Sequence, residues 1–503
     1  MLLDLSHFLK VKAEYVKDDL PFHVLPTRYV LRLKPLPADD MYIGYVKMSI
    51  LCLSNTSSIV LHADTALTVP LLGITVREPI TYRNEIPAII PITSLRRQTQ
   101  TSHLIITLEK QLVEWTTYEL KIHFNGKLTS PEEGDFFKGK YIDETSGKKK
   151  WYIGTKLRPG TAKKMFPCFD GTDYKASFSI SIARANDSKA TILTNTKRKS
   201  ITKMRGTHDW VWEHFDITPR MLPSSIGIAI FEFDEVVSGN AHGVDICMYG
   251  DKDLSLEMDS LLRDFMKLWG FLTDYLDRSL PMDKIDIIIL PNFVLDSHAN
   301  SWGLIFSSDY LIPNDWSVLH GLLDQWFHHF VSPQNYHSPL QNALHKFLLW
   351  ESGLMSWKPS ERLSGLLDDY TTSKMSIEPY EWFLRMLNYS LSAETLRLGL
   401  QNFVGDSQVF STYTDSLLWY ILTDVSHNQS TLDSSVSLKD VAYSWVGLDS
   451  APIEETEILD SEEFSWTKAD QEHTLTEEYQ RIDHIPIVTI QRNYEYNMAS
   501  IEQ

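Results

Sequence analysis

Apolar and polar residues alternate along much of the first half of the chain. The alternation is regular over residues 29–34 and again over residues 176–182. A period of two places successive side chains on opposite faces of a strand, so that one face packs on a core and the other meets solvent. Clusters of turn-forming residues separate such runs, for example at residues 35–40 and 125–135. Residues 20–237 are therefore predicted to form a β domain, an antiparallel sandwich or saddle.

The hydrophobic pattern changes near the middle of the chain, where apolar residues begin to recur every three or four positions. From Leu254 to Tyr275 this spacing predicts an amphipathic helix. A short apolar run over residues 285–290 then predicts a buried strand. Residues 317–448 are mostly helical in pattern, with Trp, Leu and Phe on the buried stripes. We therefore predict a second domain over residues 238–448 that is mixed at first and then dominated by helices.

Three segments lie outside these two predicted domains. Residues 1–19 mix apolar and charged positions and lack the continuous apolar stretch of a signal peptide, so they are treated as a leader segment. Residues 449–484 are acidic and irregular, which is typical of a solvated linker or insertion. Residues 485–503 open with a strand pattern, and a lone strand cannot form a domain. This segment either docks on the preceding residues or is the truncated start of a third, small β domain.

Composition narrows the class of protein. With 503 residues, 43% hydrophobic and 22% charged, the chain is predicted to be globular and multidomain, of the α+β class. Its formal net charge of −19 disfavours nucleic acid as a partner, because phosphate binding needs a cationic surface. No apolar run approaches the length of a membrane span, so we expect none in this chain. Cys52, Cys168 and Cys247 are too few cysteines for a disulfide framework or a Cys-rich zinc module.

One segment carries a pattern associated with metal binding. His320 and Asp324 are four residues apart in a helical pattern and share one face. In the motif H-E-x-x-H, two histidines at that spacing bind zinc and the Glu beside the first is the general base. Here Gly321 takes the place of that Glu and has no proton acceptor. By itself the pair is a weak signal, because His and Asp also occur together on ordinary helices. Pairing Asp324 with His328 at the same spacing is an alternative.

Several sequence words in a fixed order give this segment its context. They read L-P-T-R-Y-V-L-R-L-K-P at residues 25–35, K-K-M-F-P-C-F-D at 163–170, N-S-W-G-L-I at 300–305, Q-W-F at 325–327 and L-R-M-L at 384–387. In these words and their order the chain resembles the aminopeptidase N family of zinc metallopeptidases, which are of the gluzincin type.

The resemblance covers about residues 20–448 and the strand pattern after residue 485. It implies an N-terminal β-sandwich or saddle domain followed by a thermolysin-like, mostly α-helical domain, which in the family carries out proteolysis with a bound zinc ion. We expect the family's large C-terminal helical domain to be absent from this chain, which would leave the cleft more open.

The resemblance also assigns positions to the candidate metal ligands. His320 keeps the first ligand, Gly321 replaces the general base, and Asp324 replaces the second histidine. The family's third ligand is a Glu, and Glu351 in the word L-L-W-E-S-G is the matching residue. Because 26 residues separate Glu351 from Asp324, this match requires an insertion in this chain. The candidate metal ligands are thus His320, Asp324 and Glu351, all of types that bind zinc.

The positions that would contact substrate also depart from the family. Asn300 stands where the family has a Glu that grips the substrate's free amine. Arg158 occupies a second amine-binding position, and its permanent positive charge would repel an ammonium group. Ile377 takes the place of the proton-donating Tyr, and Tyr380 is three positions away from it. The substrate-binding candidates are therefore the degenerate positions Asn300 and Arg158, and no residue is assigned as catalytic.

These replacements predict a loss of catalysis. A general base contributes about 10²–10⁴-fold in rate and one transition-state donor about 10²–10³-fold. We therefore predict a catalytically inactive homologue, or pseudoenzyme, that binds a peptide or a protein partner. The alternative is an active zinc-dependent metalloaminopeptidase, a hydrolase that removes N-terminal residues from peptides with a rearranged site. A partial gene product without a selected role is a third alternative.

Cofactor and compartment are inferred from the same observations. We assign no cofactor, and zinc stays open as the ion that the retained ligand types would bind. The resemblance and the N-x-[ST] sequons favour an extracellular or membrane-associated glycoprotein, whereas the lack of a signal peptide leaves a cytoplasmic location open. Nothing in the sequence predicts the oligomeric state. The sequons lie at Asn55, Asn186, Asn388 and Asn428.

Overall fold

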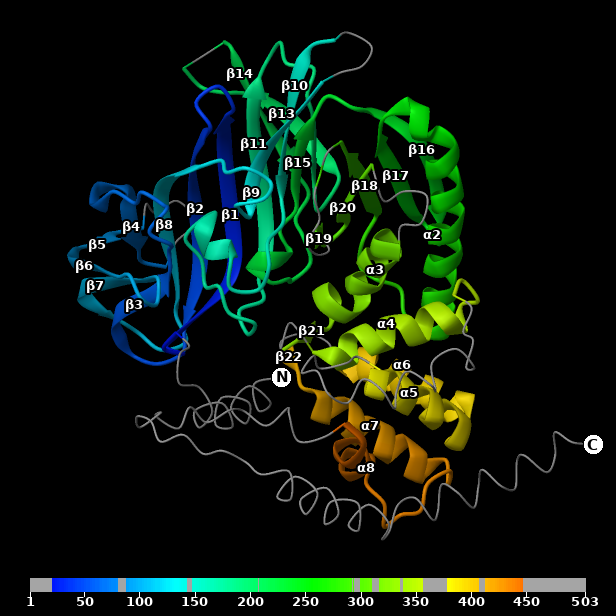
Figure 1. Cartoon of the computed structure of the whole chain (residues 1–503). Coiled ribbons are helices and arrows are strands. Elements are labelled where there is room, and N and C mark those ends of the chain that lie inside the picture. The colour runs from blue at the N-terminus through cyan, green and yellow to red at the C-terminus, as the bar shows by residue number, and fades with distance from the viewer. Residues whose placement is uncertain are drawn as a thin grey trace, which may run out of the picture. The chain divides into compact units, whose positions relative to one another are not determined.

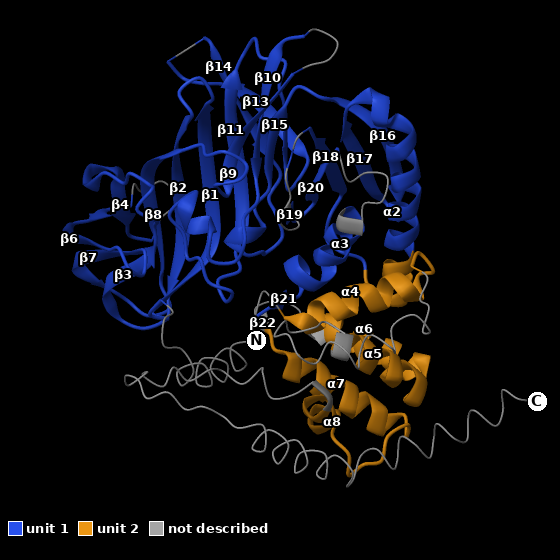
Figure 2. Cartoon of the chain, in the orientation of Figure 1, with its two compact units in different colours: residues 1–270, 279–334, 408–412 blue, residues 271–278, 335–407, 413–503 orange. Residues whose placement is uncertain are grey.

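The computed structural model divides the chain into two compact units, shown in Figure 2. Unit 1 comprises residues 1–270, 279–334 and 408–412, and unit 2 comprises residues 271–278, 335–407 and 413–503. The predicted segments 1–19, 449–484 and 485–503 lie outside the described residues. The structure describes residues 20–79, 87–142, 147–206, 208–291, 293, 299–309, 316–334, 338–355, 378–406 and 412–446.

Unit 1 begins with the β-rich part of the chain (Figure 1). In the described residues its largest sheet has eight strands in the order β13-β14-β11-β1-β2-β8-β4-β5. A second sheet has the order β12-β15-β10-β9 and a third the order β3-β7-β6. The strands of the first sheet are β1 (Val24–Leu36), β2 (Met41–Cys52), β4 (Ile74–Arg77), β5 (Ile89–Ile90), β8 (Thr117–Lys127), β11 (Ser177–Ala185), β13 (Arg198–Lys203) and β14 (Trp210–Phe215). Those of the other two are β3 (Thr56–His62), β6 (Ile92–Gln98), β7 (His103–Leu112), β9 (Phe136–Ile142), β10 (Lys149–Thr155), β12 (Thr191–Thr194) and β15 (Ile228–Phe231).

The two alternating runs of the sequence become the central strands β1 and β11. Buried and partly buried residues alternate along most of β1, as the period-two pattern predicts. The two strands pair in parallel, with Tyr29 opposite Phe178, and their rings stack at 4.6 Å. Most other pairs in this sheet are antiparallel, so one parallel pair is the difference from the predicted antiparallel arrangement. The prediction of a β-rich N-terminal part is confirmed.

The later part of unit 1 contains a mixed sheet with the strand order β16-β17-β18-β20-β19. Its strands are β16 (Asp234–Ala241), β17 (Val244–Gly250), β18 (Lys284–Leu290), β19 (Ala299–Ser301) and β20 (Leu304–Ser308). Helix α2 (Ser255–Tyr275) comes after β17 and buries Met258, Phe265 and Leu268 at helical spacing. Helix α3 (Trp316–Asp324) continues into a π-helical turn, Gln325–Phe330, and then into β21 (Ser332–Pro333).

Unit 2 is helical in its described residues. Phe383 meets Trp419 edge to face at 5.3 Å, and Phe403 meets Tyr413 in the same way at 4.9 Å. Its elements are α4 (Pro339–Glu351), α5 (Glu378–Ser390), α6 (Ala393–Asp406), β22 (Thr412–Tyr413, which starts in unit 1), α7 (Asp415–Asn428) and α8 (Leu438–Val446).

The division into units differs from the division expected from sequence. The predicted boundary at residue 237 falls inside unit 1, because β16 pairs with β17, and β17 with β18, in one continuous sheet. The predicted domain limits stay a prediction. Within the described ranges, no helix combines the length and the apolar character needed to cross a membrane.

Candidate functional site

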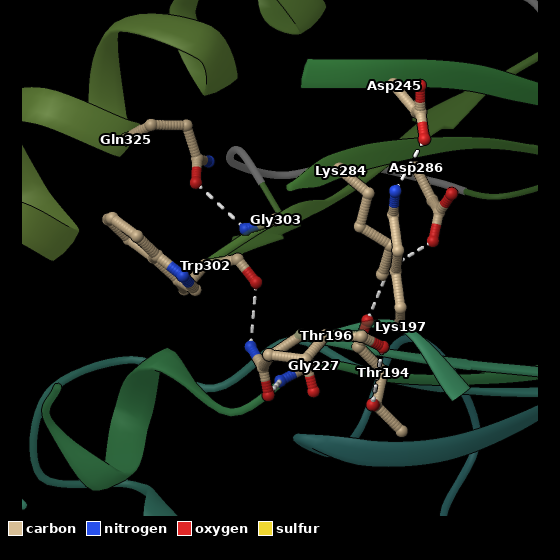
Figure 3. Close-up of polar contacts among 11 residues, drawn as sticks. Thr194, Thr196, Lys197, Gly227, Asp245, Lys284, Asp286, Trp302, Gly303 and Gln325 are labelled. Atoms are coloured by element: carbon tan, nitrogen blue, oxygen red, sulfur yellow. Dashed lines mark hydrogen bonds and ion pairs between the residues drawn. The ribbon is translucent and has the colours of Figure 1, made fainter. Parts of the chain in front are cut away.

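One buried amide fastens helix α3 to the β19–β20 hairpin. The Gln325 side chain accepts a hydrogen bond from the Gly303 backbone N–H at 2.9 Å, as Figure 3 shows. It donates to the carbonyl oxygens of Ser301 at 3.2 Å and Gly321 at 3.0 Å. All three partners are backbone groups, and a buried backbone group without a partner is costly. Gln325, in the word Q-W-F, therefore has a structural role in fixing the helix against the hairpin.

A second buried amide ties the same hairpin to the β-rich part of unit 1. Asn195 donates to the carbonyl oxygens of Trp302 at 2.7 Å and Ser225 at 2.8 Å, and accepts from the Gly227 N–H at 3.1 Å. Gly303 has a φ of 69°, and a Cβ placed there would lie 2.9 Å from the Asn195 carbonyl oxygen. The word W-G thus requires glycine, because any side chain would collide with backbone.

A buried ion pair lies beside this junction. Lys284 donates to the Thr194 carbonyl oxygen at 2.6 Å and pairs with the carboxylate of Asp286 (Figure 3). Burial raises the pKa of Asp286, and the neighbouring Lys284 opposes that rise. Removing one partner of such a pair would leave a buried charge uncompensated. The pair is therefore a structural element of the junction between two sheets of unit 1.

Four side chains of unit 1 form a continuous chain of hydrogen bonds, and we name them the Asn300 network: Ser225, Asn300, Asp324 and His329. Asn300 Nδ2 donates to Asp324 Oδ2 at 2.6 Å, and Asn300 Oδ1 lies 2.9 Å from His329 Nε2. His329 Nδ1 lies 2.9 Å from Ser225 Oγ. None of the four residues is more than 8% exposed. The network joins β19, the end of α3, the π-helical turn and the 3-10 helix Pro223–Ser225 that comes before β15.

The chemistry of the groups sets the direction of this network. An amide nitrogen only donates and an amide oxygen only accepts, so Asn300 donates from its nitrogen to Asp324 and accepts on its oxygen from His329. Burial, and then the neighbouring His328, lower the pKa of His329 far below its usual range, so the ring is neutral. Its one proton therefore lies on Nε2 and is donated to Asn300, while Nδ1 accepts from the Ser225 hydroxyl. Asp324 is the final acceptor of the network.

The position of the family's general base has no acid–base group and little room for one. Gly321 is buried on α3, and a Cβ placed there would lie 3.1 Å from Ile305 Cγ2. A larger side chain at this position would have to displace Ile305. His320, the matched first ligand, is partly exposed on the same helix. The helix therefore offers His320 and Asp324 without a base beside them.

The third candidate ligand belongs to the other unit. Glu351 ends α4 in unit 2 and accepts a hydrogen bond from Asn388 Nδ2 at 2.9 Å. Burial raises the pKa of Glu351, and the bond from Asn388 lowers it. The predicted ligand set of His320, Asp324 and Glu351 therefore draws on both units and stays a prediction.

The described residues of unit 1 supply two of the candidate zinc ligands. A catalytic zinc site takes three protein ligands. The two are His320 and Asp324, and Asp324 already accepts the short bond from Asn300. Across the described ranges, no group of three or more His, Cys, Asp or Glu side chains is placed to hold a metal ion.

The remaining predicted positions are placed as follows. Arg158 lies in unit 1, where its backbone N–H donates to Thr161 Oγ1 at 2.9 Å and its carbonyl oxygen accepts from the same hydroxyl at 3.0 Å. Ile377 lies outside the described residues. Tyr380 is buried in α5 of unit 2, and burial, then Asp415, raise its pKa to about 12. The prediction that Arg158 and Asn300 together replace the amine anchor stays a prediction.

Two members of the Asn300 network, Ser225 and His329, were not identified from the sequence. The structure gives His329 a hydrogen bond on each ring nitrogen. The buried π-helical turn that places His329 has no simple sequence period. Ser225 lies 104 positions before His329, and no local pattern links two residues at that separation.

Comparisons with known proteins agree with the sequence words. Residues 25–225 match the Peptidase M1 N-terminal domain. The chain is 27% identical over 326 residues to the thyrotropin-releasing hormone-degrading ectoenzyme of Rattus norvegicus, covering 62% of this chain and 29% of that protein. It is 25% identical over 498 residues to aminopeptidase Q of Homo sapiens, covering 86% of this chain and 49% of that protein. It is also 27% identical over 331 residues to endoplasmic reticulum aminopeptidase 1 of Homo sapiens, covering 63% and 34% respectively.

The matched domain and these similarities support the M1 aminopeptidase family that the sequence words predicted. The chain is therefore a homologue of zinc aminopeptidases, and its N-terminal β-rich part corresponds to the matched domain. The matched region spans about half, or less, of the length of these curated relatives.

Proposed function

We propose that this chain is a catalytically inactive homologue of the zinc aminopeptidases that binds a peptide or a protein partner. The observation that carries the proposal is the Asn300 network. Two positions that the family uses for chemistry, Asn300 and Asp324, are hydrogen-bonded to each other at 2.6 Å. The base position, directly after the first matched ligand His320, is the buried residue Gly321.

The expected losses in rate support this proposal. Gly321 leaves the family's general-base position without a proton acceptor, and a base typically contributes about 10²–10⁴-fold. Losses of several catalytic groups are not additive, but together they leave little specific catalysis. The Asn300 side chain has both its amide nitrogen and its oxygen engaged, and it carries no charge to hold an ammonium group. In this proposal, the fold inherited from the family therefore binds a peptide or protein partner and does not catalyse hydrolysis.

One observation favours an active zinc aminopeptidase as the second candidate. His320 and Asp324 keep the spacing of one helical turn on α3, and both are zinc-ligand types. In this candidate Glu351 completes the ligand set. It requires the Asn300–Asp324 hydrogen bond to open when metal binds, and a proton acceptor supplied by another residue.

One experiment separates the two candidates. The purified chain is dialysed against zinc, and its zinc content and its hydrolysis of leucine p-nitroanilide are compared with those of His320→Ala. The proposal expects substoichiometric zinc and hydrolysis no faster than that of the variant. Stoichiometric zinc with chelator-sensitive hydrolysis that His320→Ala abolishes would overturn it.

The binding part of the proposal has its own test. The immobilised chain is incubated with an equimolar pool of synthetic decapeptides, and the retained peptides are identified by mass spectrometry. Enrichment of defined sequences, each displaced by an excess of itself, is the expected result. Recovery equal to that of the bare resin would contradict peptide binding.

We also infer a thermolysin-like arrangement for residues 238–448. It is supported by the packing of α3 on the β19–β20 hairpin and by the helices α4 to α8 that come after it in sequence. Variants of the candidate zinc ligands test function and do not test the fold. The check on this inference is an experimental structure of the chain. A different order of strands around β20 would contradict it.

We infer that the chain is a glycoprotein of an extracellular or membrane-associated compartment. Three sequon residues, Asn55, Asn186 and Asn428, are exposed, whereas Asn388 donates its amide to Glu351. After expression through the secretory route, a glycosidase should shift the mobility of the chain on a gel. Replacing any exposed sequon Asn by Gln should reduce the shift, and Asn388→Gln should leave it unchanged. A chain without glycan would contradict the inference.

A further inference from the structure

Unit 1 contains a cavity of about 230 Å³ that the family resemblance did not indicate. Its polar lining comes from Lys175, Arg220, Trp302 and His329. Apolar surface is contributed by residues that include Met221 and proline side chains. Pockets for drug-sized ligands are usually about 300–1,000 Å³, so this one suits a group of the size of a single amino-acid residue.

Two cations meet at this cavity. Lys175 is 4% exposed, and its Nζ donates to the Phe330 carbonyl oxygen at 2.8 Å. Arg220 donates to the Lys175 carbonyl oxygen at 2.9 Å, which places the guanidinium beside the same segment. An ammonium group has three N–H donors. In the part of the chain that the structure describes, no carboxylate pairs with Lys175, and the Phe330 carbonyl is its one hydrogen-bond partner.

Burial disfavours the charged forms of both side chains. Burial, and then the neighbouring Arg220, lower the pKa of Lys175 to about 8. Burial also lowers the pKa of Arg220. Both shifts express the cost of holding a positive charge away from water, and for Lys175 the like charge of Arg220 adds to it. An anion placed between the two cations would remove part of that cost.

A third donor lines the same cavity. Trp302 is 2% exposed, and its Nε1 has no hydrogen-bond partner among the described residues. Buried Trp N–H groups usually have a partner. His329 adds no competing acceptor, because both of its ring nitrogens are engaged in the Asn300 network. The cavity therefore presents donors and positive charge.

We propose that this cavity binds a carboxylate group, with the ammonium of Lys175, the guanidinium of Arg220 and the indole N–H of Trp302 as its donors. The apolar lining formed by Met221 and the prolines then contacts the carbon atoms attached to that carboxylate. The ligand is either a small free carboxylate or the α-carboxylate of a peptide. The site uses neither His320 nor Glu351, so it stands whether or not the chain is a peptidase.

The test compares ligands that differ only in the carboxylate. Calorimetric titration of the full chain at pH 7 uses N-acetyl-leucine, N-acetyl-leucinamide and inorganic phosphate. A heptapeptide with a free C-terminus and its amidated form make up the second arm. We expect the acids to bind about tenfold or more tightly than their amides, since a charged hydrogen bond contributes about 1.5–3 kcal/mol. A peptide acid that binds more tightly than N-acetyl-leucine identifies the peptide α-carboxylate as the source, and equal affinities identify the free carboxylate.

Variants locate the site. Lys175→Gln should weaken acid binding about tenfold or more, and Trp302→Phe, which removes only the indole donor, about three- to tenfold. Lys199→Gln is the matched control, because Lys199 is an exposed cation whose side chain is 69% accessible. The affinity of this variant for the acids should equal that of the unmodified chain. Should Lys175→Gln fail to fold, the acid and amide pairs on the unmodified chain still decide. Equal binding of acid and amide, tighter binding of phosphate than of the acids, no binding, or an effect of Lys199→Gln equal to that of Lys175→Gln would overturn the proposal.

Discussion

Two groups of residues in unit 1 meet at the same helix and hairpin and behave differently. One group holds backbone together: Gln325 and Asn195 each make three hydrogen bonds to backbone groups of separate elements. The other group occupies the family's chemical positions: Gly321, Asp324 and Asn300 depart from the catalytic pattern. The words that kept their family residues are those whose side chains support the fold. The hydrogen bonds that support the fold can thus persist after the catalytic positions have been substituted.

The largest expected effect comes from breaking the first group. Gln325→Met keeps the length of the side chain and removes all three polar contacts, which leaves the Gly303 N–H and two carbonyl oxygens buried without this partner. We expect the free energy of unfolding to fall by about 3–5 kcal/mol, measured by urea denaturation.

Gln98→Ala is the control for that measurement, because Gln98 is exposed on β6. Its unfolding free energy should change by less than about 0.5 kcal/mol. A loss for Gln325→Met as small as that of the control would show that this amide does not hold the helix against the hairpin.

A second substitution tests backbone crowding in the same group. Gly303→Ala places a Cβ 2.9 Å from the Asn195 carbonyl oxygen in a residue with φ of 69°. Gly243 has φ of 82° with no atom near the added Cβ, so Gly243→Ala isolates the strain of a positive φ. We expect losses of about 2–4 kcal/mol for Gly303→Ala and about 1–2 kcal/mol for Gly243→Ala. Both variants are measured by thermal and urea unfolding. If Gly303→Ala lost no more stability than Gly243→Ala, the contact with Asn195 would have no part in the loss.

A third substitution probes the second group through pH. Asn300→Asp places a carboxylate against Asp324, at the position of the present 2.6 Å bond, and like charges raise the folded-state pKa of one of the two. A folded pKa raised above its unfolded value makes the variant least stable above that pKa. Stability should return as pH falls towards the unfolded value near 4, by about 1.4 kcal/mol for each pH unit that separates the folded and unfolded pKa values.

The measurement for this variant is the urea midpoint at pH 5 and at pH 7.5. Asn300→Ser loses the same hydrogen bonds without adding a charge, so its loss should be nearly equal at the two pH values. An Asn300→Asp midpoint that did not rise from pH 7.5 to pH 5 would contradict the direct contact between positions 300 and 324.

The smallest effect should come from a chemical position on the helix surface. His320 is partly exposed, and His320→Ala should lower the free energy of unfolding by about 1 kcal/mol or less. The measurement is urea denaturation with and without added zinc. A zinc-dependent stabilisation of the unmodified chain that disappears in the variant would instead identify His320 as a metal ligand.

The elements were predictable wherever a local period reports burial. The alternation over residues 29–34 gave β1, and the three- and four-residue spacing from Leu254 gave α2. The π-helical turn was not predicted, because a single wide turn leaves no repeat to recognise. The parallel pairing of β1 with β11 was missed for a related reason, since period-two patterns do not reveal which strands pair.

The sequence indicated which residues belong to the candidate site, but it did not indicate which of them contact one another. The family words identified His320, Gly321, Asp324 and Asn300 as positions that matter. That Asn300 donates to Asp324 depends on a hairpin packing on a helix 24 positions away, which no spacing in the sequence expresses. The cavity was likewise hidden, because Lys175 and Phe330 are separated by 155 positions.

The sequence by itself indicated the family resemblance, the β-rich start and the helical character of the later residues, because hydrophobic period and motif words are local properties of the chain. Only the tertiary structure decided that a substituted anchor and a substituted ligand satisfy each other, and that Lys175 and Arg220 line one cavity. The physical reason is that buried polar and charged groups select their partners by distance in the fold, and packing sets that distance between segments remote in sequence.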